Sequence, residues 1–82
     1  MDEKIKKIIA EILSVDIDEI TDETVIGDLA EWDSLHQLHI LDELERQFSV
    51  KFNQDELAEL EDVSDLISLV RDLKEINWLY LR

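Results

Sequence analysis

The sequence contains no cysteine, no proline and a single glycine, Gly27, among its 82 residues. Without cysteine the chain can form neither a disulfide framework nor a thiolate metal site, and this composition is compatible with the reducing cytoplasm. With so few chain breakers, we expect helices to dominate the fold. The sequence also lacks an apolar run of membrane-spanning length, and its first residues lack the apolar core of a signal peptide. We therefore expect a cytoplasmic protein that does not insert into membranes.

Positive charge is scarce as well. The chain has 8 Lys and Arg residues against 22 Asp and Glu residues, which gives a formal net charge of −14. Such a protein would repel a phosphate polyanion, so we expect no nucleic acid as a partner, whereas partners with a basic docking surface are favoured. The hydrophobic share of 45% is ordinary for a folded protein. The length and the absence of a linker or repeat predict a single domain, residues 1–82.

Apolar residues recur at helical spacing in four segments, which predicts an all-α fold, a small four-helix bundle. The first segment lies before residue 14, the second runs from 33 or 34 to about 49, the third is short and follows Asn53, and the last begins between 62 and 64. In the third, Asn53 and Glu56 have the spacing of a capping box, and the helix is expected to run through Leu57 and Leu60. The side chains expected to face the core in the other three helices are Ile5, Ile8, Ile9, Ile12 and Leu13, then Leu38, Leu41, Leu44 and Phe48 with Ile40 beside them, and finally Val63, Leu66, Ile67, Val70 and Leu73.

Residues 14–33 have neither helical nor strand regularity and predict a long first loop. Aliphatic side chains, from Val15 to Leu29, are too frequent here for a disordered segment, so we expect them to pin the loop to the bundle. Trp32 is interpreted as a further anchor of this loop, with contact to a partner as the alternative. Residues 76–82 form a more apolar tail, for which extension of the last helix, folding back over the core and a dimer contact all stay open.

Ser34 stands at the start of the second predicted helix, in the segment Asp33-Ser34-Leu35-His36-Gln37. Ser34 with Gln37 fits a capping box, and Asp33 is an equally good cap that would make Ser34 the first helical residue. A Ser-His-Asp catalytic triad is not expected, because Ser34 and His36 lie about 200° apart around a helix. We therefore predict no catalytic residue and no enzymatic activity.

One side of the second predicted helix is polar apart from a leucine. On a helical wheel Leu35 falls well away from the buried stripe, on the side of His36, His39, Asp42 and Glu43. An exposed leucine next to a serine at a helix start suggests a docking face for partner proteins. His36 and His39 supply only two ligands, at i and i+3, and we predict no metal site.

The tripeptide Asp33-Ser34-Leu35 opens the second amphipathic helix of an acidic chain with four predicted helices. This arrangement resembles the acyl carrier proteins over nearly the whole length of the sequence. The resemblance implies that Ser34 is the attachment residue of a covalent 4′-phosphopantetheine cofactor, flanked by Asp33 and Leu35. A phosphopantetheinyl transferase would install this cofactor, and its terminal thiol would carry acyl groups as thioesters.

The same resemblance extends to partners and cargo. It implies an acyl- or aminoacyl-loading ligase and downstream synthase or transferase enzymes as partners of a monomeric carrier. The residues expected to contact partners are Leu35, His36, His39, Asp42, Glu43 and, as the alternative to its anchoring role, Trp32. In this family the bundle can also shelter an acyl chain, and the candidate lining residues are Ile40, Leu41, Leu44, Phe48 and Leu66.

The sequence departs from the family pattern in two places. It has no glycine shortly before Asp33, where many members have one, and His36, Gln37 and His39 occupy positions that are usually acidic in fatty-acid carriers. Charge-based choice of partners would therefore differ, which leads us to expect a specialised pathway instead of housekeeping fatty-acid synthesis. Two other functions stay open: a free-standing aminoacyl or peptidyl carrier, including the D-alanyl type, and an acidic helical protein-binding module in which Ser34 only caps its helix.

Overall fold

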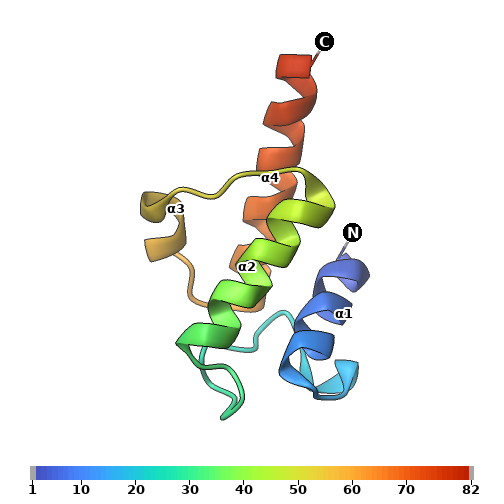
Figure 1. Ribbon diagram of the computed structural model, residues 1–82, viewed down its shortest axis with the longest axis vertical. Helices are drawn as coiled ribbons and strands as arrows, with labels where there is room; N and C mark the ends of the chain where they lie inside the picture. The colour runs from blue at the N-terminus through green and yellow to red at the C-terminus, as the bar shows by residue number, and fades with distance from the viewer. Residues whose placement is uncertain (1, 82) are drawn as a thin grey trace.

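The computed structural model describes the backbone of residues 2–81 and the side chains of residues 2–75. Within this part the chain forms four α-helices and one short 3-10 helix, in the order α1 (Asp2–Leu13), η1 (Ile17–Glu19), α2 (Ser34–Phe48), α3 (Gln54–Ala58) and α4 (Val63–Leu81). In Figure 1, α1 and α3 lie on opposite sides of α2, and α4 runs behind it. The C-terminal half of α4 projects beyond the other helices, and the molecule is accordingly elongated, with extents of 41 × 24 × 20 Å. The predicted all-α architecture, with a long first loop and a short third helix, is confirmed.

The core lies where α1, α2 and α4 meet. Each helix contributes an apolar stripe, and burying one large aliphatic side chain stabilises the fold by about 1.5–3 kcal/mol. The buried members of these stripes are Ile5, Ile8, Ile9, Ala10 and Leu13 of α1, Ile40, Leu41, Leu44 and Phe48 of α2, and Val63, Leu66, Ile67 and Val70 of α4. Ile12 and Leu73 pack at the edge of this core and are half-buried. The helical periodicity therefore predicted most of the core.

Leu38 was wrongly assigned to the core, because 59% of its surface is exposed. A rotation of about 100° per residue places Leu38 at the edge of the stripe that Leu41 and Leu44 form. In the folded chain this edge faces solvent. Leu38 thus joins Leu35 on the exposed side of α2.

Polar caps define where α2 and α3 begin and end. The side chain of Asp33 caps α2, and Ser49 ends it in the left-handed conformation, with φ 55°. Asn53 and Glu56 form the predicted capping box of α3, since each side chain accepts a hydrogen bond from the other's backbone N–H. The helix ends at Ala58, so the expectation that it runs through Leu60 was wrong.

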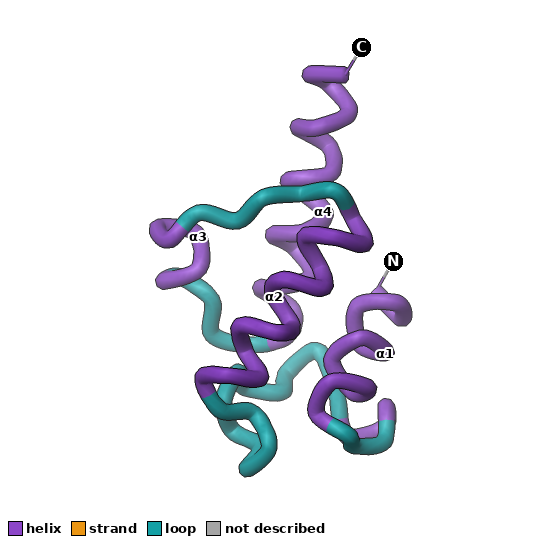
Figure 2. Tube along the Cα trace, in the orientation of Figure 1, coloured by secondary structure: helices purple, strands orange, loops and turns teal. Residues whose placement is uncertain are grey.

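The long first loop connects α1 to α2 (Figure 2). It is tied to the bundle by buried side chains and by backbone hydrogen bonds. Ile20 and Trp32 are buried at 3% exposure each, whereas Ile17 and Val25 are exposed, contrary to the expectation that all the aliphatic residues pin the loop. Val25 instead forms an isolated antiparallel β-bridge with Asp62. Gly27 turns the loop with φ 86°, a conformation that other residues rarely adopt.

For the apolar tail, the structure shows the first of the three expected arrangements, because α4 continues to Leu81. Arg82 and the side chains of residues 76–81 lie outside the described part, so the alternative of a dimer contact stays open. Among the helices of residues 2–81, none combines the length and the apolar character needed to cross a membrane.

Candidate functional site

Ser34 is the first residue of α2, and its side chain is exposed. The preceding Asp33 has an extended backbone, with φ −93° and ψ −176°, and its Oδ1 accepts a hydrogen bond of 2.9 Å from the backbone N–H of His36. Asp33 therefore satisfies one of the N–H groups that a helix N-terminus leaves without a partner. The Ser34 hydroxyl makes no hydrogen bond within the described part of the chain. The alternative in which Ser34 serves only as a helix cap is thus wrong.

Hydrogen bonds from His36 favour the ionised form of the Asp33 carboxyl. Its Oδ1 also lies 2.7 Å from Nδ1 of His36, so a proton on that nitrogen can be donated to the carboxylate. The hydrogen bond from the backbone of His36, followed by the one from its ring, lowers the pKa of Asp33. Both groups are partly exposed, with 61% of the Asp33 side chain and 37% of the His36 side chain accessible to solvent. A carboxylate that is already engaged by His36 thus stands next to Ser34.

Trp32 lies directly before this cap and is 3% exposed. Its indole N–H donates a hydrogen bond of 2.5 Å to Oε1 of Gln37, on the first turns of α2. The structure therefore supports the interpretation of Trp32 as a loop anchor. A side chain buried to this extent offers little surface to a partner, and we remove Trp32 from the proposed docking face.

Two leucines dominate the exposed apolar surface near Ser34. Leu35 and Leu38, three residues apart on α2, are each 59% exposed, and His39 and Asp42 are exposed on the same helix. The helical wheel predicted Leu35 on this exposed side but not Leu38. The spacing could have indicated that Leu38 lies beside Leu35, because residues at i and i+3 are neighbours on a helix surface.

Glu43, another predicted contact residue, is already engaged within α2. Its Oε2 accepts hydrogen bonds of 2.5 Å from Arg46 and 2.6 Å from Gln47, and only 27% of its side chain is exposed. The hydrogen bond from Gln47, followed by that from Arg46, lowers the pKa of the Glu43 carboxyl. Glu43 therefore has less acceptor capacity to offer a partner than Asp42 has.

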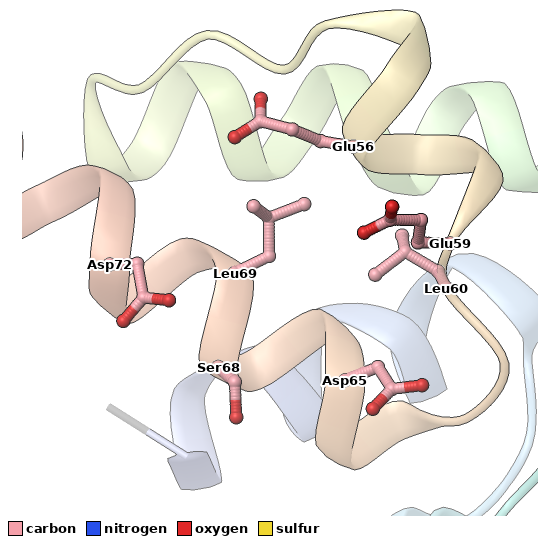
Figure 3. A pocket seen from close by; sticks show the side chains of 7 residues that line it. All are labelled: Glu56, Glu59, Leu60, Asp65, Ser68, Leu69 and Asp72. Atoms are coloured by element: carbon pink, nitrogen blue, oxygen red, sulfur yellow. The ribbon is translucent and has the colours of Figure 1, made fainter.

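The candidate acyl-pocket residues all lie in the packed core. Ile40, Leu44 and Leu66 are 0% exposed, and Leu41 and Phe48 are 8% and 6% exposed. None of them lines the cleft of about 290 Å³ that opens between α3 and α4 (Figure 3). In that cleft the side chains of Leu60 and Leu69 are surrounded by acidic residues, and the full lining is Glu56, Glu59, Leu60, Asp65, Ser68, Leu69 and Asp72.

The arrangement at the start of α2 fits an attached phosphodiester. A helix N-terminus offers N–H groups and partial positive charge to an anion, and α2 is a full 15 residues long. The exposed, unbonded hydroxyl of Ser34 is accessible to a modifying enzyme. These are the features that a group tethered to a serine would require.

Comparison with known proteins identifies the class of protein. Residues 3–70, which include Ser34, match the family model described as the phosphopantetheine attachment site. The chain is 32% identical over 75 residues to an acyl carrier protein of Petrotoga mobilis, and the match covers 92% of this chain and 88% of that protein. The chain belongs to the acyl carrier protein family. Members of this family are carriers and not enzymes, and their cofactor is covalently bound phosphopantetheine.

A solved structure and a much larger protein are also similar. The solution structure of holo acyl carrier protein from Geobacter metallireducens has a TM-score of 0.84 and 28% identity, with 94% of this chain and 88% of that chain covered. The non-reducing polyketide synthase dbaI of Emericella nidulans is 36% identical over 69 residues. This match covers 84% of the chain but only 3% of the synthase.

Proposed function

We propose that Ser34 bears the 4′-phosphopantetheine arm and that the protein presents acyl groups to partner enzymes. The observation that carries this proposal is the exposed hydroxyl of Ser34, free of hydrogen bonds within the described residues, at the N-terminus of α2. When bound, the group supplies a terminal thiol that holds acyl cargo as a thioester. The chain itself contains no cysteine, so the working thiol has to come from the cofactor.

The residues around Ser34 divide the remaining tasks. Asp33 caps α2, so the serine hydroxyl does not have to satisfy the helix N-terminus. His36 engages the Asp33 carboxylate at 2.7 Å, which reduces the repulsion that this carboxylate would exert on a neighbouring phosphodiester. The N-terminus of α2 then stabilises the attached anion.

The proposed docking face consists of Leu35, Leu38, His39 and Asp42, and we keep this definition below. The two leucines offer apolar surface beside the attachment point, and the net charge of −14 favours enzymes whose docking surfaces are basic. Its partners would be a phosphopantetheinyl transferase, an acyl-loading ligase and downstream synthase or transferase enzymes. His36 lies at the edge of this face, where its ring is already engaged by Asp33.

We further propose a specialised pathway for this carrier. Positions 36 and 39 hold histidines where fatty-acid carriers usually have acidic residues, so this chain has less negative charge close to Ser34 than those carriers have. The similarity to a segment of a polyketide synthase supports the same interpretation. A carrier of this kind would act as a monomer in the cytoplasm, as expected from the sequence. Loading trials with acyl- and aminoacyl-activating ligases distinguish an acyl carrier, which we favour, from an aminoacyl carrier.

Intact mass spectrometry tests the attachment site. The purified chain is incubated with coenzyme A and a promiscuous phosphopantetheinyl transferase, and we expect a gain of one phosphopantetheine. Ser34→Ala should gain nothing, whereas Ser64→Ala, a matched change of an exposed serine in the first turn of α4, should be modified like the wild type. An unmodified wild-type chain, or a modified Ser34→Ala chain, would contradict the proposal.

A further inference from the structure

Trp32 and Gln37 bracket the attachment residue. With Asp33 as the cap of α2, Trp32 occupies the position before the cap and Gln37 the fourth position of the helix. In many helices these two positions hold apolar residues whose contact fixes how the chain enters the helix. Here the contact is a hydrogen bond of 2.5 Å from the indole N–H of Trp32 to Oε1 of Gln37.

Gln37 stands where the buried stripe of α2 would place an apolar residue. It precedes Leu41, Leu44 and Phe48 by four, seven and eleven residues, which is the spacing of one helix face. The three later members are buried, and Gln37 is half-buried. Its amide group therefore reaches inward, where the indole N–H needs an acceptor, because a tryptophan N–H can only donate.

The hydrogen bond spans the first turn of α2. A second pair of contacts, between Asp33 and His36, lies within the segment that this hydrogen bond spans. The backbone N–H of Trp32 donates a hydrogen bond of 2.9 Å to the carbonyl of Leu29, so Trp32 is also held by the residues that precede it in the loop. Ser34 and Leu35 lie between Asp33 and His36, and both are exposed.

We propose that the hydrogen bond between Trp32 and Gln37 is a latch that positions Ser34 for modification. This inference rests on the proposed function of Ser34. The buried indole fixes the end of the loop to the bundle, and the latch fixes the first turn of α2 to the indole. Trp32 and Gln37 are positioning residues, because they hold the backbone on either side of the serine without touching the cofactor.

The kinetics of transferase modification test the latch. Gln37→Met keeps the length of the side chain and removes the acceptor, and Trp32→Phe keeps an aromatic ring and removes the donor. For each variant we expect kcat/KM to fall about tenfold, because small misplacements of a reacting group are costly. Gln37→Glu restores an acceptor oxygen and should recover most of the rate. Gln47→Met, the same change at the far end of α2, also loses one side-chain hydrogen bond and should react like the wild type.

Amide hydrogen exchange separates positioning from a general loss of stability. In Gln37→Met we expect faster exchange of the Trp32 indole N–H and of the first-turn amides of α2, with unchanged exchange between Ile40 and Leu44. A wild-type rate in Gln37→Met, or an equal loss of rate in Gln47→Met, would overturn the latch alone. A wild-type chain that the transferase leaves unmodified would overturn the proposed function and the latch with it.

Discussion

At the N-terminus of α2, two adjacent side chains have different tasks. Asp33 accepts the hydrogen bond of the helix cap, and Ser34 presents a free hydroxyl to solvent. A serine that capped its own helix would have its oxygen engaged with a backbone N–H. The division of tasks depends on the charge of Asp33, since an ionised carboxylate is the better acceptor.

This dependence predicts a difference in acid sensitivity between the wild type and Asp33→Asn. Because folding lowers the pKa of Asp33, its stabilising contribution is fully present above its ordinary pKa, about 4. The contribution is lost as the pH falls through the lowered folded value. We expect the wild type to be more stable than Asp33→Asn in urea at pH 7, and the difference to shrink by about pH 2–3, below the ordinary pKa of the carboxyl.

Asp42→Asn is the control for this prediction, because it removes one negative charge at a residue of α2 that does not cap the helix. The prediction concerns the difference between variants, since acid also reduces the repulsion within this acidic chain. A difference that stays constant from neutral to acid pH would show that the charge of Asp33 does not support the cap.

At the scale of the element, α2 has two different faces that its sequence does not make obvious. Leucines occupy positions 35, 38, 41 and 44, yet the first two are 59% exposed and the last two are 8% and 0% exposed. One face packs against α1 and α4, and the other is part of the proposed docking face. The same residue type thus serves the core at one position and recognition at another.

The two faces predict different effects for a leucine-to-alanine substitution on each of them. Leu44→Ala should lower the free energy of unfolding by about 2–5 kcal/mol, because it leaves a cavity in the core. Small domains are stable by only about 5–15 kcal/mol, so this variant should lose a large part of its stability. Leu38→Ala should change stability by less than about 0.5 kcal/mol and should weaken binding to partner enzymes.

Urea unfolding followed by far-UV circular dichroism measures the first effect, and titration with the transferase measures the second. Comparable destabilisation by the two variants would mean that Leu38 is packed in solution. Unchanged affinity of Leu38→Ala for every partner would remove this residue from the docking face.

At the scale of the whole molecule, the dominant feature is the charge of −14 on a small chain with a radius of gyration of 12.3 Å. Two cations of the described residues form ion pairs with segments that are distant in the sequence. Lys6 of α1 pairs with Asp22 of the loop at 2.8 Å, and Arg71 of α4 pairs with Asp2 at 2.9 Å. These pairs are partly or largely exposed, and such pairs stabilise proteins only weakly.

We therefore expect salt to stabilise this protein. Raising the ionic strength from about 0.01 M to about 1 M shortens the screening length from about 30 Å to about 3 Å, which removes most of the repulsion across the molecule. The urea midpoint should rise, because the repulsion that is screened exceeds what the exposed pairs lose. Urea is the appropriate denaturant since it carries no charge. A midpoint that falls with salt would show that the ion pairs outweigh the repulsion.

The sequence by itself determined the helices, most of the core and the position of Ser34, because helical periodicity and caps are local properties of the chain. Those signals predicted that Ile5, Leu44 and Val70 are buried and that Asn53 caps α3, and the structure agrees. Only the tertiary structure decided that Asp33 and not Ser34 caps α2, that Leu38 is exposed, and that Gln37 reaches the indole of Trp32. The physical reason is that the local sequence permits more than one arrangement at each of these three places. Packing against the rest of the chain selects one of them.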